Sequence, residues 1–268
     1  MATYKIGYYQ FKPIFGKFEE NLQNVLTALQ NIEADLIVLP ELPFTGYSFK
    51  DRNELESMSE DPQNSQIIEE LTKLCDKQNF HLVTGFAENN DDKCFNSALL
   101  IGADGILQTY RKLHLFNEEK YWFDAGNLPL TVTNINGMKI GMMICFDYIF
   151  PEVSRTLTLL GADIICHPSN LVLDYCQKAM VTRCLENNIF TITTNRIGEE
   201  IRPHGSVKFT GKSQITAPKG KIIHQAEVQQ ANLRIVEIDI ADARDKMITN
   251  TNHALEDRRP EFYKNKLK

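Results

Sequence analysis

Apolar residues along this chain follow two different periods. Compact apolar runs of strand length predict strands over 4–10, 35–41, 80–88, 95–102, 106–112, 138–146, 162–170 and 189–198. Segments with apolar residues at every third or fourth position predict amphipathic helices over 18–34, 65–78, 151–161 and 175–188. Because the two kinds of segment alternate, the pattern favours a layered α/β fold with sheet inside and helices outside.

The last third of the chain adds more strands to this pattern. We expect 211–227 and 232–240 to form a hairpin of two or three strands, followed by a short helix over 241–247. Long loops are expected over 43–64, 113–130 and 171–176. Since there is no Gly/Ser/Pro-rich linker and no clear repeat, we expect a single domain over residues 1–268.

Composition narrows the class of protein. The net charge is −6 and the basic residues are dispersed, which disfavours nucleic-acid binding. No apolar run reaches the roughly 18–20 residues of a membrane-spanning helix, and the first residues do not resemble a signal peptide. The six cysteines are irregularly spaced, so we expect reduced thiols in a cytoplasmic protein. Without a C-x-x-C or H-E-x-x-H motif, no metal or other cofactor is expected.

Reactive side chains stand where three predicted strands end. Glu41 follows LIVLP, Lys112 follows ILQTYR and Cys145 follows GMMI. In layered α/β folds, strand ends from distant parts of the sequence meet in one crevice. Each residue taken alone has a more common interpretation: a surface or capping carboxylate, a surface lysine and an inert buried thiol.

Together the three groups would form a nucleophilic centre. A cysteine thiol is mostly protonated at neutral pH, so it needs a base before it can attack a carbonyl carbon. Glu41, if partly desolvated, could accept that proton. Lys112 and the backbone N–H of Phe146 could stabilise the oxyanion of a tetrahedral intermediate.

The segments around these residues resemble the nitrilase superfamily, the carbon–nitrogen hydrolases. They are LIVLPELPFTGYSF, YRKLHLFNEEKYWFDAGN, GMKIGMMICFDYIFPE and GADIICHPSN, in the family's order. The resemblance implies an αββα sandwich, with Glu41 as general base, Lys112 as stabiliser of the oxyanion and Cys145 as nucleophile. It also implies a second functional glutamate, which fits Glu119 best, with Glu118 as the neighbour it could be confused with.

The activity implied by the resemblance is amidase-like hydrolysis of a small-molecule amide. A C–N bond other than a peptide bond would be cleaved through a cysteine thioester, releasing ammonia or an amine and a carboxylic acid, without a cofactor. The family further implies a homodimer or a larger homo-oligomer.

Several other residues and functions remain open from the sequence. Asn170 and Tyr47 are candidates for the pocket wall, together with the Phe146 ring, although a turn asparagine or a core aromatic would look the same. His167 is expected to be a packed strand histidine rather than a partner of Cys166, because neighbouring strand residues point to opposite faces.

Four functions compete. An N-carbamoyl hydrolase or a true nitrilase would use the same triad as an amidase. A catalytically idle binding protein on the same fold belongs to a different class, and it has no physical need for all four of Glu41, Lys112, Glu119 and Cys145. A thiol-redox protein using Cys166 and Cys176 is disfavoured by the missing C-x-x-C.

Overall fold

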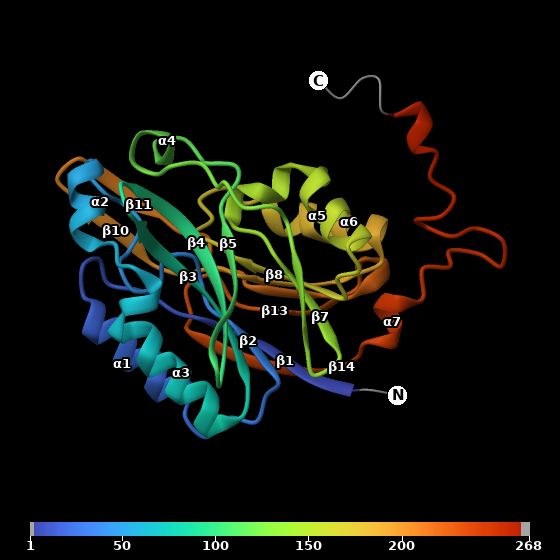
Figure 1. Ribbon diagram of the computed structural model, residues 1–268, viewed down its shortest axis with the longest axis horizontal. Coiled ribbons are helices and arrows are strands. Elements are labelled where there is room, and N and C mark those ends of the chain that lie inside the picture. Colours follow the sequence, from blue (N-terminus) through green and yellow to red (C-terminus); the bar gives the residue numbers. More distant parts are fainter. Residues whose placement is uncertain (1–2, 264–268) are drawn as a thin grey trace.

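Two six-stranded sheets lie face to face in the computed structural model, which describes residues 3–263 (Figure 1). The first sheet has the order β14 (Asn232–Asp239), β1 (Thr3–Gln10), β2 (Leu36–Val38), β3 (His81–Asn90), β4 (Lys93–Gly102) and β5 (Gly105–Arg111). The second has the order β13 (Ile222–Gln225), β12 (Gln214–Thr216), β9 (Phe190–Thr194), β8 (Ile164–Pro168), β7 (Met138–Met142) and β6 (Val132–Ile135). In each sheet three neighbouring parallel strands are flanked by antiparallel ones.

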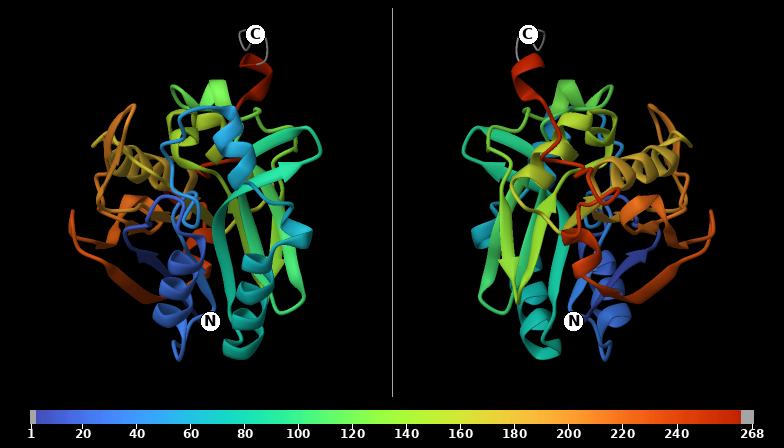
Figure 2. Two further views of the ribbon diagram at one scale, coloured as in Figure 1. Left: turned by 90° about the vertical axis from the view of Figure 1, so that its left-hand side faces the viewer. Right: turned by 90° about the vertical axis from the view of Figure 1, so that its right-hand side faces the viewer.

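Helices cover the outer face of each sheet. The first sheet is covered by α1 (Phe18–Leu29) and α3 (Gln66–Gln78), and the second by α5 (Pro151–Leu159) and α6 (Cys176–Asn187) (Figures 1 and 2). The predicted αββα sandwich is therefore confirmed. The predicted helix over 18–34 is too long, because the chain leaves the helix at Gln30 and Asn31 has a φ of 63°.

Strand β2 shows why the central strands read as unbroken apolar runs. Leu36 and Val38 face the second sheet, whereas Ile37 and Leu39 face the layer of α1 and α3. All four side chains are fully buried, since a central parallel strand is covered on both faces. The strand thereby places the residues that follow it at the edge of the interface between the sheets.

The expected hairpin in the last third is wrong in part. β12 and β13 do pair in the second sheet, but 232–240 does not join them. Instead β14 pairs with β1 of the first sheet, with Tyr4 opposite Ile238. Strand propensity identified the segment, whereas its partner depended on which sheet edge its position in the fold could reach.

The strand predicted over 138–146 is also too long. β7 ends at Met142, and Cys145 begins a 3₁₀ helix, η2 (Cys145–Ile149). Cys145 has a φ of 41°, a left-handed conformation that side chains rarely adopt. The thiol therefore stands on a tight turn beyond the strand rather than at its tip.

The expected loops contain short elements of their own. The loop 43–64 holds α2 (Arg52–Met58) and η1 (Pro62–Asn64), and the loop 113–130 holds α4 (Glu119–Trp122). The remaining elements are the hairpin β10 (Glu199–Arg202) and β11 (Gly205–Lys208), η3 (Pro218–Gly220), the predicted helix α7 (Ala241–Arg244) and η4 (Pro260–Phe262). Within 3–263, no helix has both the length and the apolar character that crossing a membrane requires.

All six cysteines are free and buried, which predicts loss of stability at alkaline pH. Burial raises the pKa of Cys75 from 9.0 to about 12. Above pH 9 the unfolded chain loses this thiol proton while the folded protein keeps it, so the free energy of unfolding falls as pH rises. The loss should reach about 1.4 kcal/mol per such thiol by pH 10.

Urea unfolding of wild type and Cys75→Ala at pH 8 and pH 10 checks this prediction. The stability difference between the two proteins should shrink by about 1.4 kcal/mol at the higher pH. A difference that does not change with pH would contradict it.

Candidate active site

A buried cluster of one ammonium and two carboxylates lies where β2 and β5 end. Lys112 Nζ is 2.7 Å from Glu41 Oε1 and 2.8 Å from either oxygen of Glu119. Lys112 and Glu41 are 0% exposed and Glu119 is 5% exposed. The structure thus brings together three of the residues singled out in the sequence, of which Glu41 and Lys112 are 71 residues apart along the chain.

Local backbone packing allows this approach. Gly85 in β3 lies so close to the chain after β2 that an added Cβ would stand 2.4 Å from Leu42 N and 2.6 Å from Glu41 Cα. Only glycine leaves this room. On the other side, Glu119 is the first residue of α4, and its Oε2 accepts a hydrogen bond from the N–H of Phe116 at 3.1 Å.

The charges of the cluster depend on one another. Burial by itself lowers the pKa of Lys112, but Glu119 and Glu41 raise it by more, so the ammonium stays protonated. Burial raises the pKa of Glu119, and the nearby Glu41 carboxylate adds to this, against the opposing effect of Lys112. One cation is therefore shared by two acidic groups.

Glu41 keeps one oxygen free of the cluster. Its Oε1 accepts hydrogen bonds from Lys112 Nζ and, at 2.6 Å, from Asn96 Nδ2. Within the described part of the chain, Oε2 is buried and has no hydrogen-bond partner. A buried carboxylate oxygen without a donor is unfavourable unless a ligand or a reacting group supplies one.

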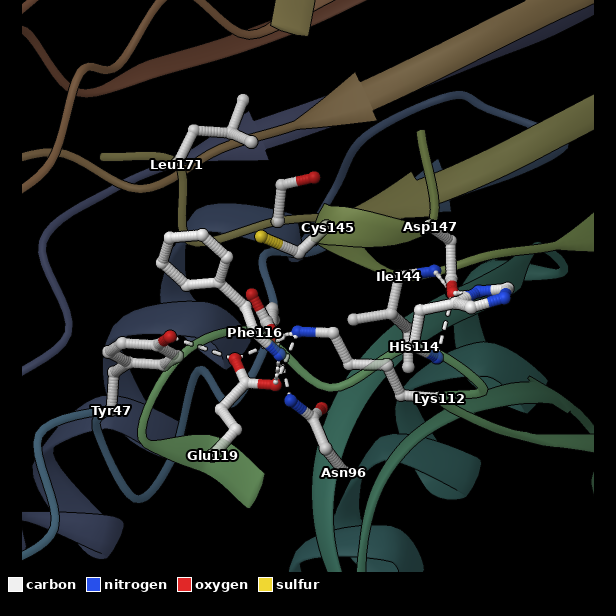
Figure 3. A network of polar contacts seen from close by, with 12 residues as sticks. Tyr47, Asn96, Lys112, His114, Phe116, Glu119, Ile144, Cys145, Asp147 and Leu171 are labelled. Carbon is white, nitrogen blue, oxygen red and sulfur yellow. Dashed lines mark hydrogen bonds and ion pairs between the residues drawn. The ribbon is translucent and has the colours of Figure 1, made fainter. Parts of the chain in front are cut away.

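Cys145 lies beside this cluster. Figure 3 shows its side chain, the Lys112 ammonium and the Glu119 carboxylate turned toward the same space, with the Phe116 ring next to them. Burial raises the pKa of the Cys145 thiol well above its usual range; Glu41 raises it further, while Lys112 opposes the shift. The thiol is therefore protonated at rest and needs a base to become a nucleophile.

The carboxylate of Asp147 supports the turn that carries Cys145, and the sequence analysis did not identify this residue. Asp147 is fully buried, and its Oδ2 accepts from Ile144 N at 2.9 Å and from the Tyr110 hydroxyl at 2.6 Å. Its Oδ1 lies 2.8 Å from Nδ1 of His114 (Figure 3). The only hint in the sequence was an acidic residue two positions after the candidate nucleophile, in an otherwise apolar stretch.

Tyr47 contacts the cluster directly. Its hydroxyl donates to Glu119 Oε1 at 2.8 Å, and burial raises the pKa of this phenol well above its usual range, with Glu119 adding to the shift. Its backbone N–H donates to Glu200. Glu118, the neighbour that could be confused with Glu119, is exposed.

Two neighbouring hollows lie beside the cluster. The outer one has a volume of about 260 Å³ and reaches Glu119, and the inner one is a recess of about 10 Å³ at Cys145. Phe116 and Val172 line both hollows, so they stand between them. The outer cavity is lined by Tyr47, Ser48, Phe49, Phe116, Asn117, Glu118, Glu119, Trp122, Phe123, Val172, Ser206, Val207 and Lys208.

Phe146 and Asn170, two of the candidates for the pocket wall, line the inner recess. The side-chain amide of Asn170 is buried without a hydrogen-bond partner among residues 3–263, and its backbone N–H lies near enough to Cys145 to oppose the rise in the pKa of the thiol. In the same range, no group of three or more His, Cys, Asp or Glu side chains is arranged to hold a metal ion.

Comparisons with known proteins agree with this architecture. Residues 5–246 match the carbon-nitrogen hydrolase family. A nitrilase of Pyrococcus abyssi is 38% identical over 262 residues, which cover 97% of this chain and 98% of the relative. A citrullinase of Francisella tularensis is 29% identical, covering 98% of both chains. The solved structure of a nitrilase-superfamily amidase from Nesterenkonia AN1 matches with a TM-score of 0.80 at 23% identity, covering 98% of this chain and 97% of that one.

The fold is therefore that of the nitrilase superfamily. The chain belongs to the carbon-nitrogen hydrolase family, and it is a carbon–nitrogen hydrolase.

The shared ammonium predicts a large effect of Lys112 on stability. Lys112→Met should lower the free energy of unfolding by about 3–5 kcal/mol, because it leaves two buried carboxylates without their cation. Adding Glu41→Gln and Glu119→Gln should recover part of the loss, since the buried charges are then removed together. Urea unfolding of the three proteins measures both effects.

Lys5→Met is a suitable control, because Lys5 pairs with the exposed Glu33. It should change the unfolding free energy far less than Lys112→Met does. Equal effects of the two substitutions would show that the buried pairing of Lys112 contributes little.

Proposed function

We propose that this hydrolase cleaves small amides through a thioester on Cys145. The observation that carries the proposal is the buried cluster of Glu41, Lys112 and Glu119 beside a protonated thiol, in which Glu41 keeps one oxygen unpaired among the described residues. Such an arrangement supplies a base, a cation and a nucleophile in one water-poor place.

In the first half of the reaction, Glu41 takes the thiol proton while Cys145 Sγ attacks the carbonyl carbon of the amide. The developing oxyanion is stabilised by the Lys112 ammonium and by the N–H of Phe146, which lies in the first turn of η2, where helix geometry leaves N–H groups without an intrahelical acceptor. Glu41 then gives the proton to the nitrogen as the C–N bond breaks. Ammonia or an amine leaves, and a thioester remains.

In the second half, Glu41 takes a proton from water, whose oxygen attacks the thioester carbon. The C–S bond breaks, the proton returns to Sγ and the carboxylic acid leaves. Glu119, held by Lys112 and Tyr47, orients the substrate nitrogen and the attacking water. Lys112 serves as a cation rather than a base, because its pKa is raised.

We favour amides over nitriles, because Glu41 can return a proton to an amine leaving group, and attack on a nitrile carbon expels no such group. The names of the relatives, nitrilase, citrullinase and amidase, show that this family also includes other substrate types. The homo-oligomer stays a prediction from the resemblance, and the cytoplasmic location stays a prediction from the cysteine spacing.

Ammonia release tests the proposed function. Wild type should release ammonia from a panel of short aliphatic amides, ω-amides, carbamoyl compounds and nitriles, with the amides fastest, and Cys145→Ala should release none. Cys75→Ala, which removes a buried thiol elsewhere, should stay active. A Cys145→Ala protein as active as wild type would refute the mechanism.

The two neighbouring glutamates can be separated in the same assay. Glu119→Gln should lower kcat by about 10²-fold or more, as expected for a group that positions reacting atoms. Glu118→Gln should have a much smaller effect, because that side chain is exposed. The opposite order would transfer the role to Glu118.

Phe116 should limit the size of the substrate. Phe116→Ala would join the outer cavity to the recess at Cys145 while keeping the backbone N–H that binds Glu119. The ratio of kcat/KM for a bulky amide to that for a small amide should rise by about tenfold or more. Phe116→Leu, which keeps most of the bulk, should give an intermediate ratio. An unchanged ratio in both variants would show that substrates enter by another route.

A further inference from the structure

His167 lies under the turn that carries Cys145, and the mechanism above does not use it. It comes from β8 and is 0% exposed. Its Nε2 is 2.9 Å from the backbone oxygen of Cys145. The sequence interpretation of a packed strand histidine accounts for its burial but not for this contact with the candidate nucleophile.

The contact defines the tautomer of the ring. A carbonyl oxygen can only accept a hydrogen bond, so Nε2 must carry the proton and donate it to Cys145. Nδ1 then accepts from Thr193 Oγ1, at 3.1 Å. Ser169 Oγ is 3.2 Å from both Nε2 and the backbone oxygen of His167, and its proton is directed to the latter. Burial lowers the pKa of His167 to about 4, so the ring is neutral at pH 7.

The oxygen that His167 binds belongs to the same peptide unit as the N–H of Phe146. A trans peptide is planar, and its C=O and N–H point in opposite directions. Holding the carbonyl toward His167 therefore directs the N–H of Phe146 away from His167. Both residues of this peptide unit, Cys145 and Phe146, line the inner recess. This N–H is the backbone donor of the proposed oxyanion site.

The peptide unit needs such support. The φ of 41° at Cys145 is unfavourable for a residue with a side chain, and strained turns persist only where their surroundings hold them. Asp147 holds the preceding residue through Oδ2 to Ile144 N, at 2.9 Å, and through its own N–H to Ile144 O, at 3.0 Å. His167 holds the following peptide through the carbonyl oxygen of Cys145.

We propose that His167 is a positioning residue, which orients the oxyanion-binding N–H of Phe146 by donating a hydrogen bond to the carbonyl of Cys145. The proposal rests on the proposed function, because the oxyanion arises only in acyl transfer. The proposal distinguishes this role of His167 from mere filling of the core. A positioning residue affects the stabilisation of the oxyanion more than it affects the reactivity of the thiol.

A pair of substitutions tests the donor. His167→Leu removes it, whereas His167→Gln can place an amide N–H near the position of Nε2. On a short amide, His167→Leu should lower kcat by about 10- to 100-fold with little change in KM, and His167→Gln should recover most of the loss. His81→Leu, at a half-buried histidine in β3, is the matched control and should keep the wild-type kcat.

A second measurement distinguishes a change in the orientation of the Phe146 N–H from general damage to the active site in His167→Leu. Methyl methanethiosulfonate reacts with a thiol at sulfur and has no carbonyl, so it forms no tetrahedral oxyanion at carbon. Its rate at Cys145, followed by peptide mass, should change far less in His167→Leu than kcat does. Equal losses in both rates, or an unchanged kcat in His167→Leu, would overturn the proposal.

The tautomer can be tested in wild type without any substitution. ¹⁵N chemical shifts at pH 7 should show a neutral His167 with its proton on Nε2, and a proton on Nδ1 would overturn the proposal even if His167→Leu does not fold. Failure of the proposed function looks different. In that case wild type and Cys145→Ala hydrolyse nothing in the panel, and His167 is then a structural residue only.

Discussion

The ammonium of Lys112, buried between Glu41 and Glu119, is the interaction on which the rest of this site depends. A buried charge is tolerated only when it is paired and hydrogen-bonded, and here one cation satisfies two carboxylates from separate segments. The requirement keeps the end of β2, the end of β5 and the start of α4 together. Burial keeps the thiol of Cys145 protonated, and the carboxylate of Glu41 raises the pKa of the thiol further.

The sandwich supplies this site from both of its sheets. Glu41 and Lys112 follow strands of the first sheet, while Cys145 follows β7 of the second. The hydrogen bond from Tyr110 on β5 to Asp147 in η2 joins the two sheets at this point. The distance between the base and the nucleophile is therefore set by the packing of one sheet against the other, and it does not rely on a flexible loop.

Burial has opposite consequences for the different parts of the site. It keeps the thiol neutral and His167 uncharged, and it strengthens every hydrogen bond that would meet an oxyanion. It also restricts access, since Phe116 and Val172 separate the recess at Cys145 from the wider cavity. In such a site the reactivity comes from a base and hydrogen-bond donors that are already in position, rather than from a free thiolate.

The local elements and the types of the reacting residues can be predicted from the sequence. Helical spacing over 65–78 predicted α3, because a helix buried on one face has apolar residues at every third or fourth position. The apolar run 35–41 predicted β2, because a strand buried on both faces is apolar throughout. The sequence motifs around Glu41, Lys112 and Cys145 predicted the carbon–nitrogen hydrolase family. The three-dimensional structure was needed to show that β14 pairs with β1, that Cys145 lies on a strained turn and that Asp147 and His167 hold this turn. The pairing of β14 with β1 and the contact of His167 with Cys145 join residues far apart along the chain, so they become visible only when the strands are packed together.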